Sequence, residues 1–228
     1  SDVFVAELAT GKVTKVSEHT GQAQFNAADF SPDNQHLYYT ANDAGEFAEL
    51  RRVNLSTWAH EPVQKADWDI TFSYFSDGGK YRVVGINEDG STKVRMYDAA
   101  SGAEVPLPAL PAGEVRGVNI ARSEKKMAFT KSLNPAIDPA DLVDSSVVRF
   151  KSFDGMEIPN ILWKPHQASA TNKAPALVWV HGGPGGQTTR AHSFAIQYLA
   201  NNGYVVLGIN NRGSSGYGKT FFAADDGK

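Results

Sequence analysis

The sequence of 228 residues contains no cysteine, which excludes disulfide bonds, thiol nucleophiles and thiolate metal ligands. Any nucleophile in the chain must therefore be an oxygen atom. No apolar run approaches the roughly 18 residues of a membrane-spanning helix. The first residues, SDVFVAEL, match neither a signal peptide nor a start at Met. We therefore expect a chain that begins within a longer protein and has no membrane partner.

An excess of charge of one sign is also missing. The 22 basic and 25 acidic residues leave a net charge of −3, which argues against a broad surface for nucleic acid. The six histidines lack the spacing of metal ligands, so we expect no metal and no cofactor. Hydrophobic residues make up 41% of the chain, enough for one large or two small domains with cores. Partners must then be recognised by shape.

A repeat with a spacing of 45 residues runs through the first part of the chain. An apolar residue closes one strand, a polar turn follows, and a second strand opens; the three copies begin at Phe30, Phe75 and Ile120. The second strands read LYYTA, YRVVGI and MAFTK, and the first two copies add a third strand, LRRVNL and VRMYDA. Four short strands per 45 residues are typical of a β-propeller blade. The alternative is three similar hairpins in an ordinary β-sandwich.

After a connector at residues 134–144, the pattern changes to that of a mixed α/β domain. Residues 147–158 alternate and turn at Asp154-Gly155, which predicts a β-hairpin. Residues 177–180 form an unbroken apolar run, which predicts a parallel strand covered on both faces. A helical stripe, a cap at Asn202-Gly203 and a strand over residues 204–209 complete a predicted β-α-β unit. The stripe consists of Ala191, Phe194, Ala195, Tyr198 and Leu199.

The strand at residues 177–180 runs directly into His181 and a loop with four glycines, Gly182, Gly183, Gly185 and Gly186, interrupted by Pro184. Without side chains, the N–H groups of such a loop can approach a ligand closely and stabilise negative charge. A loop of this type after a strand forms half of the oxyanion hole in α/β-hydrolases, where the other half follows the nucleophile of a GxSxG motif. The alternative is a glycine-rich turn without chemistry.

Three blocks in the second part of the chain resemble the prolyl oligopeptidase family of serine peptidases, especially its acylaminoacyl-peptidase-like branch. The blocks are FKSFDGMEIP (150–159), VWVHGGPGG (178–186) and INNRGSSGYGK (209–219), in the order and spacing of the family. The first part is similar to the last propeller blades that precede the catalytic domain. The resemblance implies a propeller that screens substrates above a Ser-His-Asp triad.

The chain departs from the family pattern because no serine lies in a GxSxG motif. The resemblance implies that the catalytic Ser, Asp and His all follow Lys228, so no catalytic residue is expected in this chain. It assigns the oxyanion-hole donor to the N–H of Gly183. His181, Gly182, Pro184 and Gly185 belong to the same oxyanion loop, His181 as a residue that shapes the turn and not as the catalytic base. We interpret Arg212, Ser214 and Tyr217 as structural residues near the site.

A competing motif is GSSGYGKT at residues 213–220, which fits the GxxxxGK[ST] pattern of a phosphate-binding P-loop. Three polar residues separate Ile209 from Gly213, whereas a P-loop leaves its strand directly. Asp225-Asp226-Gly227 follows within two turns, which places acid where phosphate would bind. We therefore do not expect nucleotide binding.

The sequence as a whole predicts all-β propeller blades, about three over residues 1–145, followed by the N-terminal part of an α/β-hydrolase domain over residues 146–228. The predicted function is that of a serine peptidase that hydrolyses oligopeptides through an acyl-enzyme. This chain would be a truncated and inactive portion that lacks the nucleophile. The alternative is a non-catalytic propeller module for interactions, with an inert hydrolase remnant.

Overall fold

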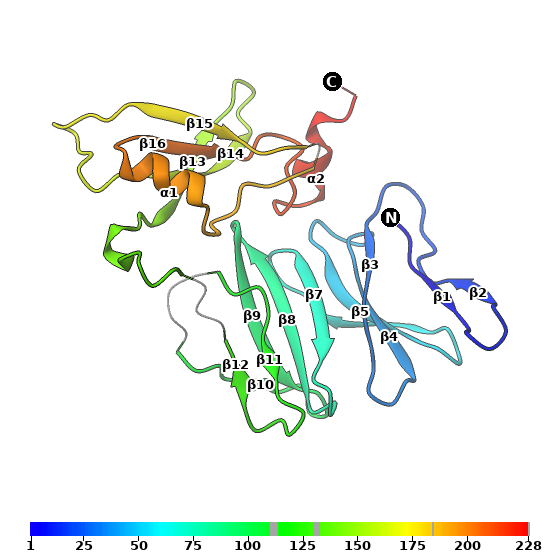
Figure 1. The fold of residues 1–228 in the computed structure, drawn as a ribbon. Helices are drawn as coiled ribbons and strands as arrows, with labels where there is room; N and C mark the ends of the chain where they lie inside the picture. The colour runs from blue at the N-terminus through cyan, green and yellow to red at the C-terminus, as the bar shows by residue number, and fades with distance from the viewer. Residues whose placement is uncertain (110–113, 130–132, 184, 228) are drawn as a thin grey trace. The chain divides into compact units, whose positions relative to one another are not determined.

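The computed structural model describes residues 1–109, 114–129, 133–183 and 185–227 (Figure 1). It is mostly β-sheet with few helices and forms two compact units. The first unit holds residues 1–88, 92–109 and 115–129. The second holds residues 133–227, together with Glu114 and the short segment Asp89–Ser91. Among the described residues, no helix is both long enough and apolar enough to span a bilayer.

The first unit consists of two four-stranded sheets and two hairpins. The sheets have the orders β3-β4-β5-β6 and β10-β9-β8-β7, and the hairpins are β1–β2 and β11–β12. The strands span Phe4–Ala6 (β1), Val13–Lys15 (β2), Phe25–Phe30 (β3), His36–Ala41 (β4), Glu49–Asn54 (β5), His60–Gln64 (β6), Ile70–Phe75 (β7), Tyr81–Glu88 (β8), Ser91–Asp98 (β9), Glu104–Val105 (β10), Asn119–Ile120 (β11) and Met127–Ala128 (β12).

The predicted repeat of 45 residues is confirmed by three identical turns. In each turn one residue donates its N–H to the carbonyl of the residue five positions later. The residue three positions after that donor has a positive φ. The positive φ values are 57° at Asn34, 79° at Gly79 and 55° at Glu124. Because left-handed backbone is rare outside glycine, its return at the same spacing shows that β3–β4, β7–β8 and β11–β12 are equivalent hairpins.

A second turn type repeats between the other strand pairs. Gly11, Trp58 and Gly102 each donate an N–H to the carbonyl four residues earlier, and each has positive φ. This turn closes β1–β2, β5–β6 and β9–β10. The β1–β2 hairpin therefore corresponds to the second half of each four-stranded sheet, and β11–β12 corresponds to the first half.

Neighbouring sheets of the first unit are joined by apolar packing and by carboxylates that bond the adjacent repeat. Leu50, Ile70 and Val84 are almost fully buried in one shared cluster, and each contributes about 1.5–3 kcal/mol by leaving water. Asp29 accepts a hydrogen bond of 2.8 Å from the N–H of Phe75. Glu124 likewise accepts bonds from the Ser76 hydroxyl and from the N–H of Lys80, and the Ser76 bond holds the pKa of Glu124 below its usual value.

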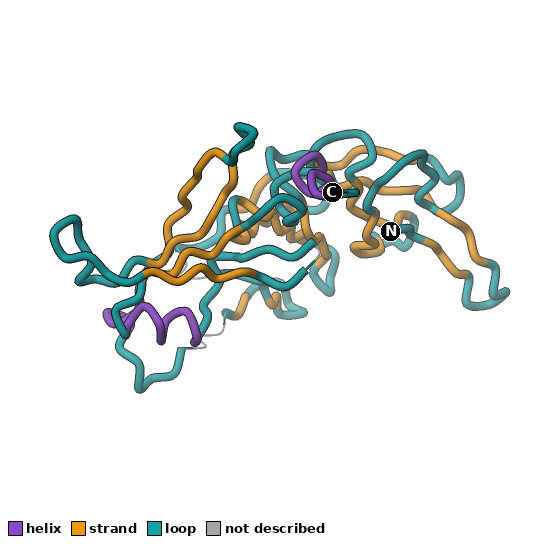
Figure 2. Tube along the Cα trace, turned by 90° about the horizontal axis from the view of Figure 1, so that it is seen from above, coloured by secondary structure: helices purple, strands orange, loops and turns teal. Residues whose placement is uncertain are grey.

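The second unit contains one four-stranded sheet with the order β13-β14-β16-β15. Its β15 and β16 are parallel and the other neighbours antiparallel, and Figure 2 shows α1 lying along the sheet. The chain between β15 and β16 forms α1, so the predicted β-α-β unit is confirmed. The elements span Pro139–Asp141 (η1), Ser145–Lys151 (β13), Glu157–Trp163 (β14), Ala176–Val180 (β15), Phe194–Asn201 (α1), Val205–Ile209 (β16), Lys219–Phe222 (α2) and Ala223–Asp225 (η2).

The prediction that residues 177–180 are covered on both faces is wrong. All five residues of β15 are exposed, and Val178 and Val180 retain 59% and 66% of their accessible surface. The physical reason is that side chains of a strand point to the two faces of the sheet, and among the described residues none from β15 belongs to the buried cluster that α1 forms with β14 and β16. An apolar run without alternation indicates a strand suited to burial, but it does not supply the elements that bury it.

The predicted helix exists, and Leu199 of the predicted stripe packs against the core cluster, but the rest of the buried face was assigned wrongly. The helix ends before Gly203, as predicted, but it begins at Phe194, where Ser193 caps it, and so leaves out Ala191 of the predicted stripe. The stripe residues Phe194 and Tyr198 are each 69% exposed, whereas Ile196 and Ala200 pack against the sheet. Buried Gln197 contributes to this orientation, because its side-chain amide bonds both the N–H and the carbonyl of Val143 at 2.9 Å.

The hairpin predicted around Asp154-Gly155 is confirmed with a longer turn. Lys151 pairs with Glu157, so five residues connect β13 and β14. Gly155 has a φ of 87°, which glycine adopts without strain.

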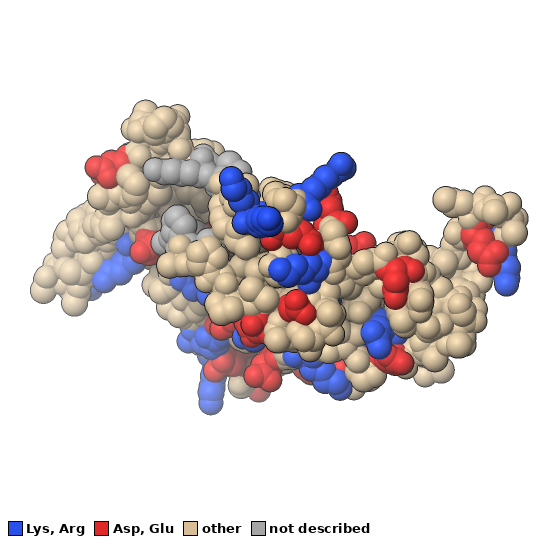
Figure 3. Space-filling model, turned by 90° about the horizontal axis from the view of Figure 1, so that it is seen from below, with Lys and Arg blue, Asp and Glu red and all other residues tan. Residues whose placement is uncertain are grey.

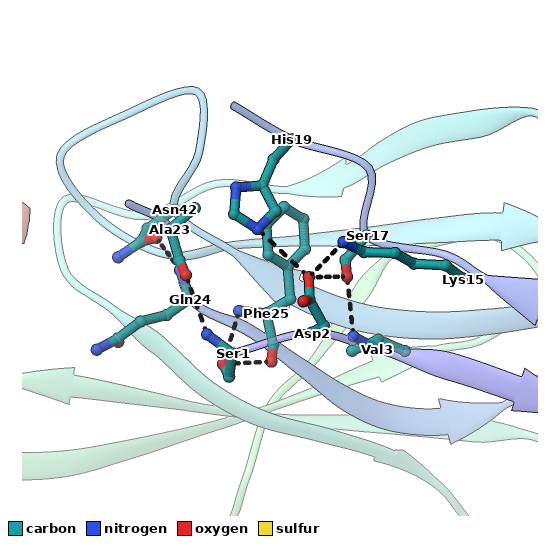
Figure 4. A network of polar contacts seen from close by, with 10 residues as sticks. All are labelled: Ser1, Asp2, Val3, Lys15, Ser17, His19, Ala23, Gln24, Phe25 and Asn42. Carbon is teal, nitrogen blue, oxygen red and sulfur yellow. Dashed lines mark hydrogen bonds and ion pairs between the residues drawn. The ribbon is translucent and has the colours of Figure 1, made fainter. Parts of the chain in front are cut away.

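A polar network joins the residues just before β1 to the residues at and just after the end of β2, and so closes the open end of the β1–β2 hairpin (Figure 4). The carboxylate of Asp2 accepts a hydrogen bond of 2.7 Å from Ser17 and lies 3.2 Å from Lys15 Nζ and 3.3 Å from His19 Nε2. The Ser17 hydroxyl in turn accepts the N–H of Val3 at 2.9 Å. The hydrogen bond from Ser17, together with the neighbouring cations, lowers the pKa of Asp2.

We expect Asp2→Asn to remove the part of the first unit's stability that the ionised Asp2 carboxylate provides and that is lost in acid. Because the pKa of Asp2 is lower in the folded state, its stabilisation is complete above the unfolded value of about 3.9 and is lost as the pH falls through the folded value. Urea midpoints of the native and variant chains should therefore differ near neutral pH and converge well below about pH 3.9. Asp226→Asn serves as a control, and an equal difference at both pH values would contradict the assignment.

Candidate active site

The parallel pairing of β15 with β16 places the two loops that follow these strands at the same end of the sheet. Val180 is the register partner of Ile209, so His181 and Asn210 follow side by side where the two strands end. The loop after β15 carries the predicted oxyanion residues, and the loop after β16 carries the RGSSGYG block. Carboxyl ends of parallel strands are the usual position of ligand sites in α/β sheets.

The loop after β15 is folded tightly at its second half and open at its first. A Cβ on Gly186 would lie 2.2 Å from the Gly182 carbonyl oxygen, and a Cβ on Gly185, whose φ is 76°, would lie 2.9 Å from the Phe222 ring. Gly182 and Gly183 are exposed, and a Cβ on Gly183 would meet nothing closer than 3.5 Å. Within the described residues, the N–H of Gly183 has no hydrogen-bond partner. Pro184 lies outside the described residues.

His181 connects the two loops. Its Nε2 lies 2.9 Å from the hydroxyl of Ser214, and its Nδ1 lies 2.9 Å from the Gly182 carbonyl. Ser214 is fully buried, and its hydroxyl lies 2.6 Å from the Asn211 carbonyl, to which it donates its proton. A buried serine whose proton is already committed cannot reach a substrate. The His181–Ser214 contact therefore holds the two loops together and does not pair a nucleophile with a base.

Asn210 was not among the residues singled out from sequence, yet its side chain makes three hydrogen bonds at this end of the sheet. The side chain is fully buried, accepts the Thr188 N–H at 2.7 Å and donates to the Thr188 carbonyl at 3.0 Å. Its Nδ2 also bonds the hydroxyl of Tyr217 at 3.0 Å. Burial raises the pKa of Tyr217, which keeps the phenol neutral. An asparagine directly after a buried strand was the available signal.

Arg212 extends the contacts to the β13–β14 turn. Its guanidinium pairs with Asp154, contacts the sulfur of Met156 at 3.2 Å and lies 5.0 Å from the centre of the Phe153 ring. The charge of Arg212 is thus paired with the exposed carboxylate of Asp154. These contacts agree with the interpretation of Arg212, Ser214 and Tyr217 as structural residues.

The P-loop pattern at residues 213–220 lacks the geometry of a phosphate site. The N–H groups of Gly213, Ser214 and Ser215 bond carbonyls of the protein, so they are not available to cradle phosphate. Helix α2 has only four residues. A Cβ on Gly213 would lie 2.2 Å from a carboxylate oxygen of Asp225, so a negatively charged group lies against the first glycine of the motif.

Charged side chains of both signs, and side chains that could ligate a metal, are distributed over the described residues. On the face drawn in Figure 3, Lys and Arg side chains are interspersed with Asp and Glu. Throughout the part of the chain that the structure describes, no group of three or more His, Cys, Asp or Glu side chains could hold a metal ion.

Comparison with known proteins identifies the kind of protein that carries this arrangement. No family model matches the chain. Dipeptidyl aminopeptidase BIII of Pseudoxanthomonas mexicana is 35% identical over 113 residues, covering 47% of this chain and 16% of that protein. A probable dipeptidyl-aminopeptidase B of Trichophyton verrucosum is 26% identical over 226 residues, covering 94% of this chain and 22% of that protein.

A solved structure from work on two prolyl endopeptidases superposes with a TM-score of 0.78 at 16% identity, covering 98% of this chain and 36% of that one. The fold is therefore that of propeller-containing peptidases. The chain belongs to the prolyl oligopeptidase family of peptidases, as the three sequence blocks predicted. It spans about a fifth of the length of the curated relatives it matches.

Because the amides at residues 213–215 are already bonded, we expect no nucleotide binding at the GSSGYGKT segment. Calorimetric titration of ATP with Mg²⁺ should be flat for the native chain and for Lys219→Ala. Micromolar affinity in the native chain that is lost in the variant would restore the P-loop interpretation.

Proposed function

We propose that this chain is part of a serine peptidase that hydrolyses oligopeptides through an acyl-enzyme. In this proposal residues 1–145 supply propeller blades, and residues 146–228 supply the N-terminal part of an α/β-hydrolase domain. The nucleophile, the acid and the base are contributed from outside these 228 residues. Relatives named dipeptidyl aminopeptidases and a fold shared with prolyl endopeptidases support peptides as the substrate class.

The observation that carries the proposal is the N–H of Gly183. Gly183 lies after the carboxyl end of a parallel strand and is an exposed residue, and its N–H has no partner within the described residues. Such a donor is suited to the oxyanion of a tetrahedral intermediate, which forms when a hydroxyl attacks a peptide carbonyl. His181, Gly182, Pro184 and Gly185 would form the loop that presents it. The non-catalytic alternative would be favoured if the complete coding sequence contained no GxSxG motif.

The 228-residue chain alone should not react as a serine hydrolase, because an oxyanion donor without nucleophile or base is only part of the machinery. A fluorophosphonate probe should leave the pure chain unlabelled while it labels a known serine hydrolase in the same tube. Ser214→Ala is the informative variant, since Ser214 contacts His181. Specific labelling that disappears in this variant would show a nucleophile within the chain and refute the proposal.

In the longer enzyme, deleting the Gly183 N–H should lower kcat more than it raises KM, because the hydrogen bond forms mainly in the transition state. The expected loss is about 10²–10³ in kcat. A backbone ester at Gly183 deletes the N–H with little change of shape, and an ester at Gly182 is the matched control. If the Gly183 ester folds and keeps full kcat on a peptide, Gly183 is only a turn residue.

A further inference from the structure

The side chain of Asn210 bonds both backbone groups of Thr188, as a residue of a neighbouring strand does. Its amide oxygen accepts the Thr188 N–H at 2.7 Å, and its amide nitrogen donates to the Thr188 carbonyl at 3.0 Å. One residue exchanging both backbone hydrogen bonds with a partner is the pattern of an antiparallel ladder. Here the primary amide reproduces that pattern, because it carries a donor and an acceptor at the spacing of a peptide group.

No other side chain of similar size could make this set of bonds. Asparagine also bonds the Tyr217 hydroxyl through its second N–H, so each of its two polar atoms is satisfied although the residue has 0% exposure. An aspartate would have no donor for the Thr188 carbonyl and would bury a charge. A leucine would fill the space but leave the buried N–H and carbonyl of Thr188 without partners, which is costly.

The bonds of Asn210 complete a set of three that hold the glycine loop. The loop is held at its start by the His181–Ser214 contact of 2.9 Å and in its second half by the Ser215 N–H, which bonds the Gly186 carbonyl at 3.0 Å. Asn210 holds its end at Thr188. All three come from residues 210–215, and the unpaired N–H of Gly183 lies between the first and second. The direction of that N–H is therefore set by the loop after β16.

We propose that Asn210 is a positioning residue that fixes the conformation of the glycine loop and, through it, the direction of the Gly183 N–H. The inference rests on the proposed function for its catalytic consequence, but the contact itself does not. Donors in an oxyanion hole act because they are held in place before the reaction. A glycine-rich segment has the greatest backbone freedom to lose, so it needs such an external restraint.

The restraint is measured in the 228-residue chain by NMR on uniformly ¹⁵N-labelled protein. In Asn210→Ala, where water can enter to satisfy the freed groups, the Thr188 amide should exchange about 10-fold or more faster. The order parameters of the Gly182 and Gly183 amides should fall from about 0.85, typical of rigid backbone, toward 0.6. Amides of the β15–β16 ladder should stay protected, which separates a released loop from an unfolded sheet.

The chain offers a matched control in the next residue. Asn211 is exposed, its contact with Ser214 uses the backbone carbonyl, and its side chain bonds the Arg212 carbonyl at 2.7 Å and not the glycine loop. Asn211→Ala should therefore leave the exchange and order of the glycine loop unchanged. Tyr217→Phe removes one partner of Asn210 but keeps both bonds to Thr188, so it should also leave the Thr188 amide protected. If Asn210→Ala keeps the ladder and shows native exchange at Thr188 and native order at Gly183, the proposal is wrong.

The catalytic consequence is tested separately in the longer enzyme. Asn210→Ala should lower kcat by up to about 10², the loss expected from a displacement of about 1 Å, with little change in KM and none for Asn211→Ala. A Gly183 ester with full kcat would refute the proposed site but leave the NMR result intact. A Gly183 ester with low kcat and an Asn210→Ala variant with native kcat would refute only the positioning role.

Discussion

The parallel pairing of β15 with β16 is the constraint on which the candidate site depends. Its register pairs Val180 with Ile209, 29 positions later in the chain, and so brings the following residues His181 and Asn210 to the same end of the sheet. Only then can the loop after one strand hold the loop after the other. Without this pairing the glycines would be a flexible segment, and their N–H groups would have no defined direction.

The second unit thus combines a restrained loop with a sheet edge that is not covered. Val178 and Val180 are exposed on β15, whereas Asn210 and Ser214, which are polar, are fully buried. At these four positions the usual distribution, in which apolar side chains are inside, is reversed. The buried polar groups are bonded to the loop, so burial strengthens the restraint on the glycines, because a buried bond broken leaves unsatisfied groups.

The first unit shows how a repeat can be specified locally. Asn34, Gly79 and Glu124 differ in chemistry yet share positive φ at a spacing of 45 residues, so the turn is enforced by the strands on either side of it. Carboxylates then join successive repeats, as Asp29 does with Phe75 and Glu124 with Ser76. Each contact lies between neighbours in the series, as is typical of repeat architectures.

The sequence by itself determined the repeat of 45 residues, the β-α-β unit with its cap at Asn202-Gly203 and the family, because these depend on local periodicity and on short motifs. Only the tertiary structure decided which helix face is buried, that β15 is an exposed edge, and that Asn210 restrains the glycine loop. Those properties depend on which segments meet in space. A helical stripe or an apolar run is compatible with several packings, and a single asparagine carries no pattern that reveals its partner 22 residues away.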